Sequence, residues 1–226
     1  MMAQRPRFDA VCFDCDSTLT RIEGIDELAR RAGREAKVAS LTEAAMNGVI
    51  PLEVVYAKRL DLVRPDRAAL AWLAERYVDE MVIGAAETVA TLRQHGKAVY
   101  VVTSGLLQAV SEFVSALGLA PAQVHAVWVH LDAAGAYQGF DSSSPLCRSD
   151  GKATICRSIA AMHGNVAMVG DGVTDLAARE GGAYVVGYGG VSHRDIMLRE
   201  ADCYIAAPSL TATLPALLTE EEPPGH

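Results

Sequence analysis

The sequence predicts an α/β protein: a parallel β-sheet with helices on both faces, interrupted by an inserted helical segment and a small β-hairpin. Short apolar runs alternate with amphipathic helical segments over most of the chain, which is typical of parallel sheets. One long interval, residues 15–97, breaks this alternation and reads as a series of helices. A shorter interval, 129–141, has the pattern of a β-hairpin that turns at Ala134-Gly135.

Four apolar runs are expected to form buried strands of the sheet: residues 8–14, 98–103, 166–171 and 183–187. A fifth run, 203–206, could add an edge strand. Helical patterns follow at residues 105–117, 152–163, 173–180 and 192–200. Strands that alternate with helices of this length indicate a Rossmann-like core.

The interval that breaks the alternation contains four amphipathic stretches separated by Gly or Pro: residues 24–33, 37–48, 51–63 and 66–81. Residues 84–96 then read as an ordinary crossover helix that leads back to the sheet. We therefore expect residues 18–83 to form an inserted α-helical cap domain. The core would comprise residues 1–17 and 84–218, with the hairpin at 127–141, and residues 219–226 would be a disordered tail.

The composition limits the classes of protein to which the chain can belong. Its 226 residues are 50% hydrophobic, enough for one domain with a large insertion. The net charge of −8 argues against a nucleic-acid partner, which would require a basic surface. No apolar run reaches the ~18 residues of a membrane helix, and the first residues lack the apolar core of a signal peptide. We therefore expect a cytoplasmic protein with no membrane partner.

The five cysteines do not indicate a disulfide framework, because their number is odd and their positions are scattered. Cys12 and Cys15 form a CxxC pair. A zinc ribbon would require a second pair at a matching spacing, and a redox CxxC normally opens a helix rather than ending a strand. We expect buried structural thiols.

Seven polar residues stand where the predicted strands end or where the neighbouring helices begin: Asp14, Asp16, Thr103, Ser104, Lys152, Asp171 and Asp175. In an open parallel sheet, ligands bind outside the carboxyl ends of the strands. Chance packing would not usually bring four separate stretches of this kind to one edge. We expect these side chains to form a single site.

The chemistry of this site follows from its clustered acids. Asp14 and Asp16 would repel each other and be costly to bury, so packing does not explain them. Together with Asp171 they could hold Mg²⁺, which prefers oxygen ligands and neutralises clustered carboxylates. One carboxylate could attack phosphorus and form an aspartyl-phosphate, while a second could protonate the leaving oxygen and then activate water. Lys152 could supply the positive charge that phosphoryl transfer requires.

Four motifs, in order along the chain, resemble those of the haloacid-dehalogenase-like superfamily and, within it, the phosphoserine phosphatase family. They read "DCDST" (14–18), "VVTSG" (101–105), "DGKATI" (150–155) and "GDGVTDL" (170–176). The stretches "EGIDELA" (23–29), "AMNGVIPLEVVYAKRL" (45–60), "YQGFD" (137–141) and "VGYGG" (186–190) resemble the same family. The resemblance covers residues 8–206 and implies a Mg²⁺-dependent hydrolase whose partner is a small phosphomonoester, O-phospho-L-serine.

The resemblance also implies a role for each acid. Asp14 would be the nucleophile, and Asp16 the general acid and base. The side chains of Asp14 and Asp171, with the backbone carbonyl of Asp16, would bind Mg²⁺. Asp175 would orient Lys152 or a water ligand of the metal.

The phosphoryl group and the amino-acid part of the substrate would have separate partners. Thr103, Ser104 and Lys152 would hold the phosphoryl group. Glu23 would receive the substrate ammonium and Arg59 its carboxylate, which a guanidinium can bind in a bidentate manner. Three further residues would line the substrate side of the cap, namely Met46, Gly48 and Leu52.

Two positions depart from the family pattern, and both touch the predicted substrate pocket. The family usually has Phe where Leu52 stands, and its second motif usually reads Ser-Gly-Gly-Phe rather than Thr-Ser-Gly-Leu at residues 103–106. The same chemistry on another small phosphorylated metabolite is therefore an alternative. A phosphomutase of the same superfamily and a non-catalytic binding module are two more, and the oligomeric state is expected to be a monomer or a homodimer.

The two charged residues assigned to the substrate also have plainer explanations. Glu23 could complement the dipole of the helix that follows it. Arg59 could form a surface ion pair with Glu53 or Asp61.

Overall fold

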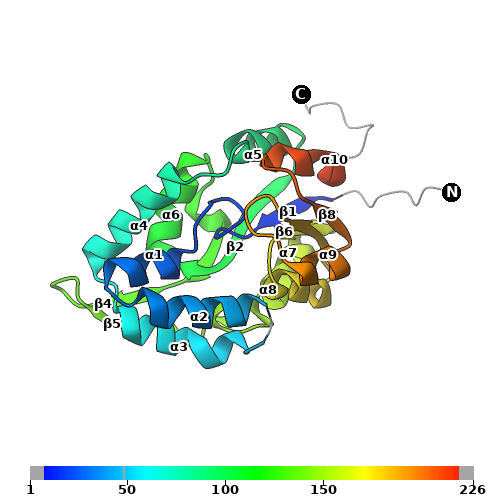
Figure 1. The fold of residues 1–226 in the computed structure, drawn as a ribbon. Coiled ribbons are helices and arrows are strands. Elements are labelled where there is room, and N and C mark those ends of the chain that lie inside the picture. Colours follow the sequence, from blue (N-terminus) through cyan, green and yellow to red (C-terminus); the bar gives the residue numbers. More distant parts are fainter. Residues whose placement is uncertain (1–7, 48, 219–226) are drawn as a thin grey trace.

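The computed structural model describes residues 8–47 and 49–218. Within this part of the chain, six strands form one parallel sheet in the order β3-β2-β1-β6-β7-β8 (Figure 1). The strands are β1 (Ala10–Phe13), β2 (Ala98–Leu106), β3 (Val124–Val127), β6 (Val166–Gly170), β7 (Tyr184–Tyr188) and β8 (Cys203–Ile205). β1 pairs with β2 on one side and β6 on the other. The residues after β1 therefore lie near the middle of the row formed by the carboxyl ends of the strands.

The helices that pack around this sheet are α5 (Ala85–Gln94), α6 (Leu107–Ala116), α7 (Gly151–His163), α8 (Val173–Leu176), α9 (Asp195–Glu200) and α10 (Leu214–Leu217). Every residue of β1 and β6 is buried, which explains why these strands are continuous apolar runs rather than alternating ones. The predicted α/β class with a parallel sheet is confirmed.

Four helices connect β1 to α5 and lie together beside the sheet, coloured blue to cyan in Figure 1. They are α1 (Gly24–Arg31), α2 (Glu35–Met46), α3 (Leu52–Val63) and α4 (Arg67–Asp79). Asp66 caps the first turn of α4, because its Oδ1 accepts a hydrogen bond from Ala69 N at 2.7 Å. We propose that residues 18–83, which contain these helices, are the cap domain expected from the sequence.

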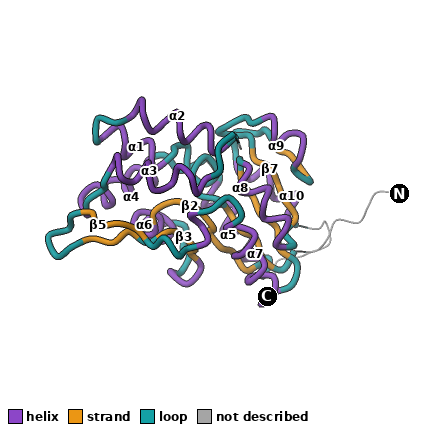
Figure 2. Tube along the Cα trace, turned by 90° about the horizontal axis from the view of Figure 1, so that it is seen from below, coloured by secondary structure: helices purple, strands orange, loops and turns teal. Residues whose placement is uncertain are grey.

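The predicted hairpin is present as an antiparallel pair, β4 (Val129–Leu131) and β5 (Tyr137–Phe140). Gly135 in its turn has a φ of 89°, a left-handed conformation that favours glycine. The Gly135 carbonyl accepts a hydrogen bond from Arg67 N at 2.9 Å. The hairpin tip extends beyond the sheet in Figure 2 and is tied to the start of α4 by this bond.

Some elements differ from the prediction. Strand β3 was not predicted, and β2 extends three residues further than the expected 98–103. The expected helix 173–180 is divided into α8 and a 3₁₀ helix at Ala177–Gly181. The predicted edge strand is present as β8. Gly48 and the predicted tail at 219–226 lie outside the described residues.

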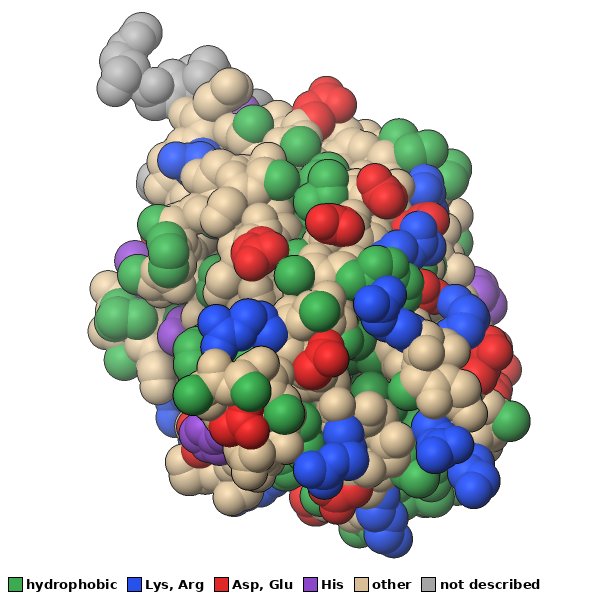
Figure 3. Space-filling view, turned by 90° about the vertical axis from the view of Figure 1, so that its left-hand side faces the viewer, with side chains coloured by type: hydrophobic (Ala, Val, Ile, Leu, Met, Phe, Trp, Pro, Cys, Tyr) green, Lys and Arg blue, Asp and Glu red, His purple; other side chains and the backbone are tan. Residues whose placement is uncertain are grey.

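The distribution of charged side chains and the state of the cysteines can be compared with the expectations from the composition. On the face shown in Figure 3, Lys and Arg side chains are interspersed with Asp and Glu rather than gathered in one basic patch. No helix among the described residues is both long and apolar enough to cross a membrane. All five cysteines are free thiols, and Cys12 and Cys15 are buried, as expected for a structural pair.

Candidate active site

The site begins where β1 leaves the sheet. Asp14 N still donates to Val169 O at 2.9 Å, so Asp14 is held at the end of the β1–β6 ladder. Its Oδ1 accepts a hydrogen bond from Cys15 N at 2.7 Å. Ser17 then adopts a left-handed backbone conformation with φ of 53°, which costs energy for a residue with a side chain and is common at functional turns. The turn carries the chain out of the sheet toward α1.

Lys152 lies between two carboxylates. Its Nζ is 2.8 Å from Asp14 Oδ2 and 2.6 Å from Asp175 Oδ1, and its side chain is only 2% exposed. Burial lowers the pKa of Lys152, but the charges of Asp14 and Asp175 outweigh burial, and the pKa is raised above its ordinary value. The ammonium group is therefore charged at all physiological pH values and faces the oxygen atoms of Asp14.

Asp175 is fixed by both of its carboxylate oxygens. One accepts from Lys152, and the other accepts from Gly172 N at 3.0 Å. Burial raises the pKa of Asp175 to about 6, against the opposing charge of Lys152. The Asp175 carboxyl packs directly on Gly170, where a Cβ would lie 2.0 Å from Asp175 Cγ. Glycine at position 170 therefore allows the contact that orients Lys152.

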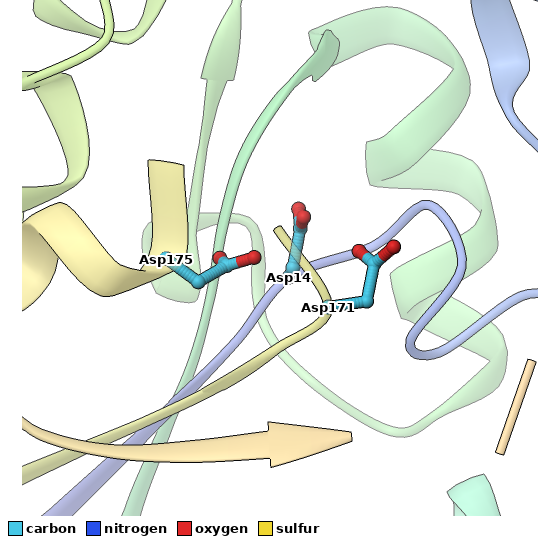
Figure 4. A group of neighbouring side chains, drawn as sticks. All are labelled: Asp14, Asp171 and Asp175. Atoms are coloured by element: carbon cyan, nitrogen blue, oxygen red, sulfur yellow. The ribbon is translucent and has the colours of Figure 1, made fainter. Parts of the chain in front are cut away.

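Asp14, Asp171 and Asp175 each offer an oxygen, and these oxygens lie within 4.8 Å of one another. Figure 4 shows Asp14 and Asp171 on the segments that follow β1 and β6, and Asp175 on α8 with its carboxylate directed toward Asp14. Asp171 Oδ1 is buried without a hydrogen-bond partner among the described residues, although burial makes such an atom costly. An oxygen-preferring cation would satisfy this atom, so the residues fit a divalent metal.

Arg194 is a cation that the structure adds to this acidic cluster. Its Nε donates to Asp171 Oδ2 at 3.0 Å, and its Nη2 lies 3.9 Å from Glu23 Oε1. Its Nη1 also reaches Asn47 Oδ1 at 3.5 Å. The side chain is 12% exposed. Arg194 therefore leaves the other oxygen of Asp171 free while it joins the core to the end of α2.

Asp16 has different surroundings from Asp14. Burial and the nearby charge of Asp14 raise the pKa of Asp16 to about 7. Its Oδ1 is buried without a hydrogen-bond partner among the described residues. A carboxyl group whose pKa lies near neutrality can donate a proton and later accept one. The position and environment of Asp16 are therefore suited to acid and base chemistry.

The second motif lies at the end of β2. Thr103 is 1% exposed, and its Oγ1 accepts a hydrogen bond from Gly105 N at 3.1 Å, which leaves the hydroxyl proton available to a ligand. The Ser104 carbonyl accepts a hydrogen bond from the Tyr56 hydroxyl of α3 at 2.8 Å. Tyr56 therefore connects a helix of the proposed cap to the predicted phosphate-binding segment.

Glu23 and Arg59 place an acid and a cation in the same pocket. Glu23 accepts a hydrogen bond from Ser17 Oγ at 2.8 Å, and it makes no side-chain cap to α1. Burial, followed by the charge of Asp16, raises the pKa of Glu23 to about 8. Arg59 is 6% exposed, so it does not form the surface ion pair that the sequence left open.

One pocket is lined by nine of the residues singled out from the sequence: Asp14, Asp16, Glu23, Met46, Leu52, Arg59, Thr103, Ser104 and Lys152. Asp171 and Asp175 lie beside Asp14 in the acidic cluster. Gly48 is outside the described residues. The structure thus brings residues from the segment after β1 and from β2, α3 and α7 into one pocket.

The same architecture occurs in known proteins. A model of the haloacid dehalogenase-like hydrolases matches residues 8–181. The chain is 36% identical over 201 residues to the chloroplastic phosphoserine phosphatase of Arabidopsis thaliana, covering 87% of this chain and 68% of that protein. It is 33% identical over 199 residues to the phosphoserine phosphatase of Homo sapiens, covering 87% and 88%. The chain belongs to the phosphoserine phosphatase family of these hydrolases.

A solved structure supports this family assignment. It is a phospho-aspartyl intermediate analogue of a phosphoserine phosphatase, with a TM-score of 0.78 and 27% identity, covering 94% of this chain and 100% of that chain. The resemblance stated from the sequence motifs is therefore confirmed as to family and fold.

Among the residues near the site that were not predicted are Tyr56, Tyr77 and Arg194. Both tyrosines lie on amphipathic helical stretches, where an aromatic residue ordinarily indicates core packing. Tyr77 lines the pocket beside Gly24. Arg194 directly precedes α9 and meets Asp171 only through the tertiary fold. No local signal in the sequence would have identified these contacts.

Proposed function

We propose that this protein hydrolyses O-phospho-L-serine to serine and phosphate in a Mg²⁺-dependent reaction that passes through an aspartyl-phosphate at Asp14. The observation that carries the proposal is the presence of both Glu23 and Arg59 in the pocket that also contains Asp14 and Lys152. The substrate carries an ammonium and a carboxylate beside its phosphoryl group. The pocket offers a partner to each of these three groups, and a bound ammonium would favour the charged form of Glu23.

Arg59 is suited to a carboxylate ligand. Its guanidinium is buried, and its Nε has no hydrogen-bond partner among the described residues. A buried unpaired donor on a cation is costly, so an anionic group that reaches it would be bound strongly. Glu23 lies on the same pocket wall as Asp16 and could accept an ammonium through its second oxygen.

The first chemical step would transfer the phosphoryl group to the enzyme. A carboxylate oxygen of Asp14 attacks phosphorus, and the bond between phosphorus and the seryl oxygen breaks. Asp16 donates its proton to that leaving oxygen. Lys152 and the Thr103 hydroxyl bind the phosphoryl oxygens and offset their charge.

The second step would return the enzyme to its starting state. The Asp16 carboxylate takes a proton from water, which attacks phosphorus, and the bond between phosphorus and Asp14 breaks to release phosphate. Asp14, Asp171 and the Asp16 carbonyl would hold Mg²⁺, which neutralises phosphoryl and carboxylate charge when it is bound. Asp175 keeps Lys152 directed at the reacting group through both steps.

The proposed cap contacts the core at two places that would close over a substrate. Tyr56 of α3 donates to the Ser104 carbonyl. The Ser149 hydroxyl accepts from Leu52 N at 2.9 Å and donates to Glu53 Oε2 at 2.9 Å. These contacts support a closed form that excludes water from phosphoryl transfer, and they would have to open for the substrate to enter.

The experiment that tests the function is phosphate release from a panel of phosphomonoesters, with Mg²⁺ and with EDTA. The panel contains phosphoserine, phosphothreonine, phosphocholine, sugar phosphates and 4-nitrophenyl phosphate, with Asp14→Asn as the blank. We expect Mg²⁺-dependent release with the highest kcat/KM for phosphoserine. Preference for another ester would keep the chemistry and overturn the substrate, and no Mg²⁺-dependent release at all would overturn the enzyme proposal.

We further propose a cytoplasmic location and a monomeric or homodimeric state. The five free thiols are typical of proteins in reducing compartments. Fractionation of cells and measurement of the mass in solution would test these two proposals.

A further inference from the structure

The charge of Arg59 has an unusual partner. Its Nη1 donates to the hydroxyl of Thr42 on α2 at 3.2 Å, and no carboxylate among the described residues forms an ion pair with it. Burial lowers the pKa of Arg59, because removing a cation from water costs free energy. The guanidinium also lies over the Tyr56 ring, 5.8 Å from its centroid. Its contacts are therefore a neutral hydroxyl and an aromatic ring rather than a counter-ion.

The Thr42 hydroxyl is in turn oriented by an acid. Thr42 Oγ1 lies 2.8 Å from Asp26 Oδ1 on α1 and 3.2 Å from Val38 O. A hydroxyl has one proton, and the carboxylate is the closer and more strongly accepting partner. When the proton points to Asp26, the lone pairs of the oxygen face Arg59. The hydroxyl is then a better acceptor, because hydrogen bonds in a chain polarise one another.

We propose that Asp26 and Thr42 form a relay that positions Arg59 to bind the carboxylate of the substrate. This inference rests on the proposed function, because it names the residues that prepare one of its binding groups. The relay holds one nitrogen of the guanidinium and leaves Nε without a partner. A direct Asp26–Arg59 ion pair would instead neutralise the cation and compete with the substrate.

The three residues of the relay lie on three different helices. Asp26 lies in the first turn of α1, Thr42 is buried in α2, and Arg59 is buried in α3. A purely structural role would need these bonds only to join the helices. The two roles differ in one measurable respect, since only a positioning role affects substrates with a carboxylate more than substrates without one.

The test is the variant Thr42→Val, which keeps the shape of the side chain and removes the hydroxyl. KM and kcat are measured for phosphoserine and for two esters without a carboxylate, phosphoethanolamine and 4-nitrophenyl phosphate. We expect KM for phosphoserine to rise roughly 10-fold or more, the loss that follows from one hydrogen bond to a charged group. We expect kcat for phosphoserine, and kcat/KM for the other two esters, to change less than about 2-fold.

Two further variants test the chemistry of the relay. Thr42→Ser retains the hydroxyl and should restore KM to within about 3-fold of wild type, whereas Asp26→Asn retains an acceptor without its charge and should give an intermediate KM. Thr88→Val is the matched control. Thr88 is also a buried helical threonine, but its hydroxyl donates to Gly84 O at 2.7 Å and does not contact Arg59.

The outcomes separate this inference from the proposed function. If wild-type enzyme does not prefer phosphoserine to phosphoethanolamine, the proposed function fails. If wild type shows that preference and Thr42→Val reduces kcat/KM equally for all three esters, or for none, the relay is overturned. Thermal unfolding of each variant is measured alongside. The relay is supported if Thr42→Val and Thr88→Val lower Tm by similar amounts but only Thr42→Val raises KM for phosphoserine.

Discussion

Asp14 and Asp16 are two residues apart and have different electrostatic surroundings. Lys152 contacts Asp14 directly, whereas in the described part of the chain no cationic side chain forms an ion pair with Asp16. The first carboxylate is therefore kept close to a positive charge, and the second is kept in a buried environment that raises its pKa to about 7. This difference is what a nucleophile and a general acid require.

Replacement of Asp16 should separate the two chemical steps. With phosphoserine, Asp16→Asn should lose about 10²- to 10⁴-fold in kcat, because the leaving alkoxide requires a proton. With 4-nitrophenyl phosphate the leaving group needs no proton, but hydrolysis of the phosphoenzyme still lacks its base. Rapid-mixing absorbance should therefore show a burst of nitrophenolate close to the enzyme concentration. Equal losses for both esters and no burst would contradict the role of Asp16.

Arg194 should matter most when the metal is removed. Arg194→Met leaves Asp171 and Glu23 without that cation, and breaking a buried ion pair in this way costs about 3 kcal/mol. We expect urea unfolding in EDTA to show this loss, and saturating Mg²⁺ to reduce it because the proposed metal site would neutralise Asp171. Arg199→Met, an exposed position on α9, is the control. A loss of the same size with and without Mg²⁺ would be evidence against this account.

Sequence reasoning was effective for side chains that belong to motifs at strand ends. Asp14 and Thr103 follow or end strands, and Lys152 begins a helix that leads to the next strand, so the three could be expected to meet at the carboxyl ends of the parallel strands. They line one pocket. The contacts of Arg194 and Thr42 could not be expected in this way. Each depends on how helices pack against one another, and a helical periodicity does not determine that packing.

Among the elements, α3 of the proposed cap is joined to the loop before α7 by hydrogen bonds. Ser149→Ala removes the two hydrogen bonds of the Ser149 hydroxyl to α3. Each is worth about 1 kcal/mol. We expect kcat/KM for phosphoserine to fall about 5- to 30-fold, mostly through KM, since closure over the substrate becomes less favourable.

The control for this variant lies in the same region of the chain. Ser143→Ala removes a hydroxyl that donates to Asp141 Oδ1 and does not contact the cap. Steady-state kinetics of the two variants, measured side by side, decide the outcome. If Ser143→Ala has the same effect as Ser149→Ala, the effect belongs to the loop and not to closure.

Most elements could be predicted from their periodicity, but β3 could not. The residues Val124–Val127 run through Trp128 into β4 without a glycine, proline or asparagine between the two strands. The sequence therefore offers no boundary at which one strand ends and the next begins. Pairing with β2 separates them, and that pairing is a long-range contact.

For the whole molecule, the clustered acids should make the metal-free protein less stable as pH rises. The pKa of Asp16 is raised to about 7 and that of Glu23 to about 8, while both titrate near 4 in an unfolded chain. Between these values the folded state binds more protons, so the stability that these groups contribute is greatest below pH ~4 and is lost through pH ~7–8. In EDTA, we expect Tm to fall between pH 5 and pH 8.

Scanning calorimetry of the wild type and the double variant Asp16→Asn, Glu23→Gln checks this dependence. The double variant should show a flatter profile, and Mg²⁺ should flatten that of the wild type because the metal offsets the charge of the deprotonated acids. A wild-type Tm in EDTA that is constant or rises over this range would contradict the expected titration.

The aspartyl-phosphate at Asp14 is tested most directly by the exchange of labelled L-serine into phosphoserine. Enzyme, phosphoserine and Mg²⁺ are incubated with ¹⁴C-L-serine, and the phosphoserine is isolated and counted. If serine leaves while the phosphoryl group stays on Asp14, labelled serine can attack the aspartyl-phosphate by the reverse of the first step. We expect label in phosphoserine with wild type, and none with Asp14→Asn or with labelled alanine. Release of phosphate without any exchange of label would contradict this expectation.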